Sequence, residues 1–405
     1  MNSFSEAQKN FEYIQKIRRH IHQRPELGFA VHETANFVVQ ELSKFNNIKI
    51  KINIGQSGIV ADLEAPSKNL INQSRIRRVA LRADMDALPI QELNSCEYKS
   101  LYPGKAHMCG HDAHTAMLLG AAKILSENQH LLSQHVRFIF QPNEENFPGG
   151  APAMIKDGCL EGVDEIFGMH VWPLIEVKNY GLVTGPSMGK PDTFRIYLSG
   201  KGGHASIPHK AIDPIVIGAE LVSAFQTIVS RNIYFQDTAV LSVTQFHGGT
   251  THNVIPEKVF IEGTIRTFDA QISQLIINRM KEILKGFELA YQVKTHFEID
   301  HGYPVLNNHA ASINHTKHCL LKLFPEKNNE SFNALPSLGG EDFSYYLKEI
   351  PGCYIFLGCA NSKKGITNIC HDPQFEIDED CLIYGTALHC QWALDVNNNF
   401  SFKQS

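Results

Sequence analysis

Residues 107–127 read HMCGHDAHTAMLLGAAKILSE, a cluster of polar side chains that runs directly into an apolar segment. The first eight residues hold one thiol, three imidazoles and a carboxylate, which are side chains that bind metal ions in proteins. Cys109 and His111 are two residues apart, so they cannot share a helix face, but they can converge on one ion at a helix entrance. The pattern predicts a helix from Ala113 to Glu127 that begins beside a metal site.

Short β-rich segments lie on both sides of this helix. Residues 79–82 and 136–140 predict strands before and after it, and the order strand, helix, strand implies a parallel sheet. A helix at 150–157 and a strand at 165–170 continue the alternation. The other elements predicted for this domain are helices at 4–22, 33–45, 310–323 and 378–396, and strands at 48–54, 58–63 and 353–358. We therefore expect an α/β domain with a mostly parallel central sheet flanked by helices.

The alternation changes in the middle of the chain, where the predicted order becomes βαββαβ. The elements are strands at 193–198, 239–245, 259–266 and 292–298, and helices at 212–229 and 272–287. This order is typical of a ferredoxin-like unit, and we expect it to form an inserted domain of residues 191–301. Residues 1–190 and 302–405 then form one discontinuous catalytic domain, with residues 397–405 as a frayed tail.

Composition and charge narrow the class of function. The 405 residues are 43% hydrophobic and 20% charged, which is enough for two globular domains with full cores. A net charge of -5 provides no basic field for nucleic acid, and no apolar run approaches the ~20 residues that span a bilayer. The polar N-terminus and nine cysteines without a CxxC pair favour a cytoplasmic protein with reduced thiols. Small-molecule chemistry is the function class that remains.

Candidate ligands follow the carboxyl ends of the predicted strands, where open α/β sheets build their sites. Asp84 and Asp86 come after the strand that ends at Arg82, and the pair Glu144 and Glu145 comes after 136–140. His170 ends a further strand. Because these ends meet at one edge of a parallel sheet, we expect the side chains to lie close together.

The paired glutamates indicate a metal-activated hydrolase. Such an enzyme needs one carboxylate as a ligand and a second to take a proton from water, and Glu144 and Glu145 can divide these tasks. Asp86 can orient a ligating histidine and fix its tautomer. Late in the chain, Cys370 and His371 add further candidate ligands.

Each of these groups also has a simpler explanation when taken alone. A Cys-x-His pair occurs by chance, paired glutamates often form a solvated face, and His170 sits in an apolar run that suits a core histidine. His204 and His209, which lie near paired glycines, can be simple loop residues. The joint occurrence at strand ends favours a metal site over these separate explanations.

With these residues identified, the chain resembles the aminoacylase, hippurate hydrolase and auxin-conjugate hydrolase branch of the dinuclear metallopeptidases, from about Ile17 to Gly385. The motifs that carry the resemblance are RRHIHQRPELGF (18–29), LRADMDALPIQE (81–92), HMCGHDAHTAMLLGAA (107–122), FQPNEE (140–145), GMHVWP (168–173), GKGGHASIPH (200–209), THNVIP (251–256), GTIR (263–266) and GGEDFSYYL (339–347). Members of this branch commonly carry Leu or His where this chain has Cys370.

The resemblance implies a cofactor of two divalent metal ions per subunit. The ligands that it implies are Cys109, His111, Glu145, His170 and His371. One thiolate among imidazoles and a carboxylate favours Zn²⁺, with Mn²⁺, Ni²⁺ and Co²⁺ as alternatives. The other polar residues of the opening cluster are then expected to support these ligands or to lie at the helix entrance.

The resemblance also implies roles in catalysis and substrate binding. Glu144 is the general base that activates a metal-bridging water, and Asp86 supports it. His204 stabilises the oxyanion, while Asn253 and Arg266 hold the carboxylate end of the substrate. The inserted domain is implied to be a lid that also forms a homodimer, with a tetramer as the alternative.

The reaction implied is hydrolysis of the amide bond of N-acyl amino acids. One alternative is a di- or tripeptidase of the same superfamily, against which Cys109 argues because peptidase relatives usually carry a bridging aspartate. The other alternative is a metal-dependent binding protein without turnover, which would have no need of Glu144. The sequence does not specify the acyl group, because pocket shape rather than a motif selects it.

Overall fold

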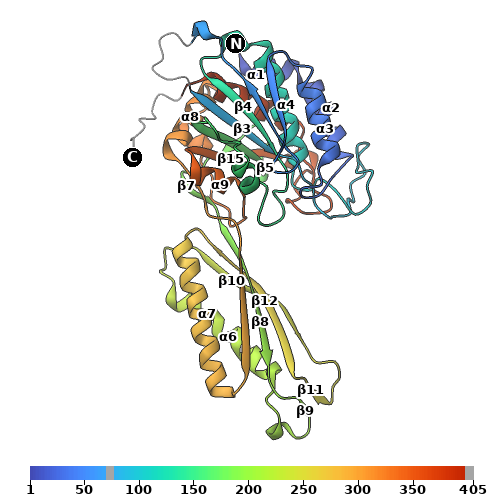
Figure 1. Ribbon diagram of the computed structural model, residues 1–405, viewed down its shortest axis with the longest axis vertical. Helices are drawn as coiled ribbons and strands as arrows, with labels where there is room; N and C mark the ends of the chain where they lie inside the picture. Colours follow the sequence, from blue (N-terminus) through green and yellow to red (C-terminus); the bar gives the residue numbers. More distant parts are fainter. Residues whose placement is uncertain (70–76, 397–405) are drawn as a thin grey trace. The chain divides into compact units, whose positions relative to one another are not determined.

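The computed structural model describes residues 1–69 and 77–396, so the predicted tail at 397–405 lies outside the described residues. The chain forms two compact units (Figure 1). The first comprises Met1–Gly185, Asn307–Leu335 and Asp342–Ser405, and the second comprises Pro186–Leu306 and Pro336–Glu341. The second unit contains the predicted insert of 191–301 and also a short later segment that the sequence placed with the catalytic domain. Within the described ranges, none of the helices is long and apolar enough to cross a membrane.

The first unit is built on a seven-stranded sheet with the order β1-β2-β4-β3-β5-β15-β6. The strands are β1 (Ile48–Ile54), β2 (Gly58–Leu63), β3 (Arg78–Asp84), β4 (His135–Gln141), β5 (Glu165–Glu176), β6 (Tyr180–Gly181) and β15 (Gly352–Ala360). Strands β4, β3, β5 and β15 are parallel, whereas β1, β2 and β6 pair with their neighbours antiparallel.

The sheet is therefore mixed, and the prediction of a mostly parallel sheet is wrong at its edges. For the pair of β1 and β2, the reason lies in the connection between them, which is only three residues long. So short a turn can join antiparallel strands only, because a parallel pair needs a crossover of a dozen or more residues. The parallel core formed by β4, β3, β5 and β15 carries the carboxyl ends at which the candidate ligands lie.

Helices cover both faces of this sheet (Figure 1). Their bounds are α1 (Ser3–Lys9), α2 (Phe11–His22), α3 (His32–Leu42), α4 (His111–Glu127), α5 (Ala151–Lys156), α8 (Ala310–Leu323), α9 (Phe343–Glu349) and α10 (Cys381–Leu394). Successive residues of β15 point to opposite faces, as a pleated strand requires. Cys353 contacts Thr316 of α8, whereas Tyr354 packs on Phe343 of α9.

Helix α4 is the centre of the core, and nearly all of its residues are buried. It packs against α2 and α10, and its glycine lets α2 approach closely. A Cβ atom on Gly120 would lie 2.7 Å from Cγ1 of Ile14, closer than carbon atoms pack. The helix begins at His111, two residues earlier than predicted, so that His111 lies in its first turn.

The second unit has the element order strand, helix, strand, strand, helix, strand. Its elements are β8 (Lys190–Ser199), α6 (Pro214–Asn232), β10 (Ala239–Gly248), β12 (Lys258–Thr267), α7 (Ala270–Tyr291) and β13 (Lys294–His301), and the chain adds the short strands β7 (Gly185–Met188), β9 (Gly203–His204), β11 (Val254–Ile255) and β14 (Leu306–Asn308). The sheet order is β10-β12-β8-β13, all antiparallel. Phe194, Ile196 and Leu198 alternate inward along β8 into a core with Leu221 of α6 and Met280 of α7.

Substitution of Gly120 tests the packing of α4. We expect Gly120→Val to lower the free energy of unfolding by about 1–3 kcal/mol, because added side-chain bulk forces strain in a filled core. The matched control is Gly286→Val on α7, where a Cβ atom meets nothing within 4 Å, and we expect it to change stability by less than about 1 kcal/mol. Urea unfolding of both variants measures the difference. Equal stability of the two variants would contradict the close packing.

Candidate metal centre

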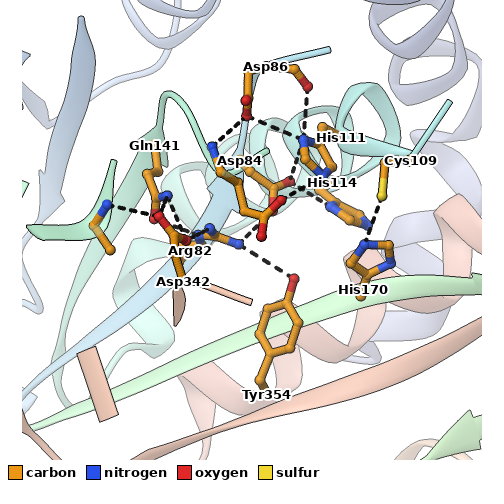
Figure 2. A network of polar contacts seen from close by, with 12 residues as sticks. Arg82, Asp84, Asp86, Cys109, His111, His114, Gln141, His170, Asp342 and Tyr354 are labelled. Carbon is orange, nitrogen blue, oxygen red and sulfur yellow. Dashed lines mark hydrogen bonds and ion pairs between the residues drawn. The ribbon is translucent and has the colours of Figure 1, made fainter. Parts of the chain in front are cut away.

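The carboxyl ends of the parallel strands bring the predicted ligands together. His170 lies inside β5 rather than at its end, while the glutamate pair follows β4 and Cys109 precedes α4. The sulfur of Cys109 lies 3.4 Å from Nε2 of His170 (Figure 2). Oε1 of Glu145 lies 3.9 Å from Nε2 of His111 and 3.5 Å from Nε2 of His371. All five candidate ligands thus form one cluster.

Three overlapping groups within this cluster have spacing that suits metal ions. In each group the ligand atoms lie within 4.8 Å of one another. The groups are Cys109, His111 and His170; Cys109, Glu145 and His371; and His111, Glu144 and Glu145. Cys109, His111 and Glu145 each belong to two of these groups, so neighbouring groups share candidate ligands.

Two buried polar atoms test whether these residues fit a metal. Nε2 of His111 and Oε1 of Glu145 are buried, and neither has a hydrogen-bond partner among residues 1–69 and 77–396. A buried polar atom without a partner costs about 1–3 kcal/mol, and such atoms are few in folded proteins. Both atoms are metal-ligand atoms of the right type and they face each other, so the donor set fits a divalent cation.

Asp86 holds the loop that carries the paired glutamates. Its carboxylate oxygens accept hydrogen bonds from the backbone N–H of Glu144 at 2.9 Å and of Glu145 at 3.1 Å. The backbone carbonyl of Asp86 accepts from Nδ1 of His111 at 2.8 Å, which leaves Nε2 directed at the glutamates. Burial raises the pKa of Asp86, although His111 opposes the shift. Asp86 therefore fixes the positions of one imidazole and two carboxylates at once.

A backbone hydrogen bond holds His371 beside the cluster. Its N–H donates to the carbonyl of Met108 at 2.7 Å, which places the 370–372 segment beside the Cys109 loop. The residue has a φ of +70°, a left-handed conformation that is uncommon for residues other than glycine. Its side chain is 54% exposed, so it forms the solvent-facing side of the cluster.

Electrostatics favours cation binding at the thiol and at one imidazole. Contact with the Cys370 thiol, burial and the Glu145 carboxylate raise the pKa of Cys109 well above its usual value. A cation is needed to stabilise the thiolate in this place. Burial and the nearby rings of His114 and His111 lower the pKa of His170 well below its usual value, so the imidazole is neutral and can donate its lone pair to a metal.

The predicted oxyanion donor His204 and the two predicted substrate-binding residues, Asn253 and Arg266, lie in the second unit. His204 of β9 pairs with Val254 of β11, and the carbonyl of Asn253 accepts a hydrogen bond from the N–H of Ala205 at 3.1 Å. His204 and Asn253 are therefore neighbours on an exposed part of that unit. Arg266 lies apart from them on β12, where its Nε donates to Oγ1 of Thr264 at 3.0 Å. Their roles at the metal cluster stay predictions.

The structure also reveals contacts around the cluster that sequence reasoning missed. Asp84, which the sequence predicted as a candidate ligand, and Arg82 lie at the end of β3 and are buried. Arg82 pairs with Asp84 and also with Asp342, which lies 258 positions after Asp84 in the sequence. Figure 2 shows Arg82 between the two carboxylates. The signal for Arg82 was a charge inside an apolar strand, but nothing local in the sequence identified its partner.

With this geometry established, the chain can be compared with known proteins. The profile of peptidase family M20/M25/M40 matches residues 80–395. The chain belongs to this family. It is 46% identical to an N-acyl-L-amino acid amidohydrolase of Geobacillus stearothermophilus over 72% of this chain and 76% of the relative. It is 40% identical to an N-acetyl-L-cysteine deacetylase of Bacillus subtilis strain 168 over 91% of this chain and 84% of the relative.

The likeness to a solved M20 structure covers 97% of this chain. A solved structure of a dinuclear metal-binding peptidase of family M20 from Bacillus subtilis is 30% identical and superposes with a TM-score of 0.81. The match also covers 99% of that chain. The predicted resemblance to the amidohydrolase branch of the dinuclear metallopeptidases is confirmed by these relatives.

Metal titration tests the cluster. A cation that binds only the folded state stabilises it by about 2.7 kcal/mol at a concentration one hundred times its dissociation constant. We expect zinc to give a gain of this size to chelator-treated protein in urea unfolding, because it satisfies the buried atoms of His111 and Glu145.

The thiol supplies the matched control for this titration. Cys109→Ser should lose most of the zinc-dependent gain, while Cys390→Ser, which alters a buried thiol on α10, should keep it. A wild-type protein whose stability does not respond to zinc, manganese, nickel or cobalt would contradict a metal centre here.

Proposed function

We propose that this protein is a metal-dependent amidohydrolase that cleaves the amide bond of N-acyl amino acids, releasing a carboxylic acid and a free amino acid. The observation that carries the proposal is the cluster of Cys109, His111, Glu145, His170 and His371 with Glu144 beside it. The names of the Geobacillus and Bacillus relatives support the same reaction. The five clustered residues are the proposed ligands of two divalent ions.

The donor set supports zinc as the first choice of metal. One thiolate, three imidazoles and one carboxylate form a ligand set of borderline softness, and manganese, nickel and cobalt remain the alternatives. When bound, such ions act as Lewis acids and lower the pKa of a coordinated water to about 7. The side chains then have to receive, hold and return a proton.

Glu144 is the proposed proton carrier. Its side chain is only 7% exposed, and Oε2 lies 3.9 Å from Nε2 of His111, at the inner side of the cluster. Glu144 takes one proton from the attacking water as the carbon–oxygen bond forms. It returns that proton to the amide nitrogen as the carbon–nitrogen bond breaks, so that the amine leaves neutral. Asp86 keeps the carboxylate in place through the backbone N–H of Glu144.

The second unit has a proposed role in binding the substrate. His204 is the proposed donor to the oxyanion, and Asn253 and Arg266 are the proposed partners of the substrate carboxylate. We propose the unit as a ferredoxin-like lid that also forms a homodimer. The nine cysteines are free thiols, which supports a reducing compartment such as the cytoplasm.

Replacement of Glu144 tests the proton-transfer step. Glu144→Gln keeps the size of the side chain but removes the base, and we expect kcat to fall by about 10²–10⁴-fold or more. Zinc content and the unfolding transition should stay unchanged. Glu12→Gln, an exposed carboxylate on α2, is the control and should retain full activity. A Glu144→Gln variant with most of its activity would exclude the residue as the base.

A substrate comparison separates the amidohydrolase from a peptidase, which the name of the Bacillus structure suggests. We expect kcat/KM for N-acetyl-methionine or hippurate to exceed that for Met-Ala and Gly-Phe by more than about tenfold, which equals about 1.4 kcal/mol in the transition state. The assay uses zinc- and manganese-loaded protein. Preference for the dipeptides would favour the peptidase, and no turnover of either class would favour a binding protein.

A further inference from the structure

A chain of hydrogen bonds connects a buried arginine to one of the proposed metal ligands, and Figure 2 shows four of its members, Arg82, Asp84, His114 and His170. Nη1 of Arg82 donates to Oδ2 of Asp84 at 2.5 Å, and Oδ1 of Asp84 lies 2.6 Å from Nδ1 of His114. Nε2 of His114 accepts from the N–H of Val171 at 2.9 Å. The carbonyl of the same Val171 lies 2.6 Å from Nδ1 of His170. All five residues are buried.

The backbone groups of Val171 determine which nitrogen atom of each histidine carries the proton. A backbone N–H can only donate, so Nε2 of His114 is an acceptor without a proton. Its proton is then on Nδ1, from which it is donated to Asp84. The carbonyl of Val171 can only accept, so Nδ1 of His170 carries the proton and Nε2 has the free lone pair. That lone pair faces the sulfur of Cys109.

A glycine allows the two segments to come this close. Gly110 has a φ of +88°, and a Cβ atom built on it would lie 2.2 Å from Cγ2 of Val171. The same Cβ position lies 3.9 Å from Nε2 of His114. The glycine at the entrance of α4 thus leaves the space in which the Val171 peptide reaches His114, one helical turn further on.

We infer that His114 is a positioning residue that, held by Asp84, presents Nε2 of His170 to the metal pair. This inference rests on the proposed function, because it takes His170 as a metal ligand. The orientation of His114 matters because its ring centroid lies only 4.8 Å from that of His170. Asp84 acts through two separate oxygens, of which one binds Arg82 and the other fixes the tautomer of His114.

Asp84→Asn tests which atoms donate in these hydrogen bonds, and it changes the shape of the side chain only slightly. The asparagine oxygen still accepts from Arg82, but the amide donates to His114, which moves the imidazole proton to Nε2. Two donors then face each other at Val171. We expect zinc to bind 10–100-fold more weakly at one of two sites, the usual effect of losing a partner of a ligating histidine. Competition with a chelating dye measures the affinity without an activity assay.

Two further variants separate positioning from simple packing. His114→Gln places an amide oxygen where the N–H of Val171 donates. We therefore expect this variant to bind zinc more tightly than Asp84→Asn does, although less tightly than the wild type. His389→Gln is the control, since His389 is an equally buried histidine on α10 that packs on Phe167. We expect it to bind zinc as tightly as the wild type even if it unfolds more easily.

Nuclear magnetic resonance of ¹⁵N-labelled histidine rings in metal-free protein gives an independent readout. We expect protons on Nδ1 of both His114 and His170 in the wild type, and on Nε2 of His114 in Asp84→Asn. A wild-type Nε2 proton on His114, an unchanged zinc affinity in Asp84→Asn, or an equal loss in His389→Gln would overturn the inference.

The proposed ligand set and the inference about His114 can be tested separately. If His170→Ala bound zinc as tightly as the wild type, His170 would not be a ligand, and the positioning role of His114 would fail with that assignment. If His170→Ala lost zinc while Asp84→Asn kept it, the ligand set would stand and the inference alone would be wrong.

Discussion

The guanidinium of Arg82 pairs with two carboxylates inside the core, and the geometry of the metal cluster depends on this buried pairing. Nη1 contacts Asp84 at 2.5 Å and Nη2 contacts Asp342 at 2.8 Å, while Nε donates to Gln141 at 3.0 Å. The arginine side chain is 1% exposed, so each charge has lost its water. Removing one member of such a group costs about 3–5 kcal/mol, because the remaining charge stays buried without its partner.

The two carboxylates that pair with Arg82 form hydrogen bonds with different parts of the site. Asp84 binds Nδ1 of His114, and Nε2 of His114 accepts a hydrogen bond from the N–H of Val171, the residue after His170. Asp342 accepts from Nε2 of Gln141 and from the N–H of Ala151, which fixes the end of β4 and the start of α5. The loop between these two points carries both glutamates of the cluster. One buried cation is therefore linked through its two carboxylates both to the segment beside His170 on β5 and to the loop after β4 that carries the glutamates.

Local sequence was sufficient to predict candidate residues that are close in the chain and that the structure brings together. The spacing of Cys109 and His111 before an apolar helix predicts a metal site, and Glu144 and Glu145 are candidates because they follow a strand. The alternation of Phe194, Ile196 and Leu198 is likewise a local signal, and it predicts strand β8 correctly. Such features depend on periods of two or four residues, which a single sequence displays.

Features that depend on distant contacts could not be predicted in this way. The pairing of Arg82 with Asp342 joins residues 260 positions apart, and the sequence holds no complementary pattern for it. His371 was assigned through a short motif, because a single backbone bond to Met108 brings it to the cluster. The alternation of strands and helices along the chain predicts a mostly parallel sheet, whereas the short turn before Gly58 implies the antiparallel pair that the structure has.

Crystallography of the zinc-loaded protein, with anomalous scattering recorded on both sides of the zinc absorption edge, would locate the metal ions. We expect two anomalous peaks per chain within the cluster of Cys109, His111, Glu145, His170 and His371. His170 should coordinate through Nε2, with its Nδ1 still bonded to the carbonyl of Val171. A single peak elsewhere, or coordination of His170 through Nδ1, would contradict these expectations.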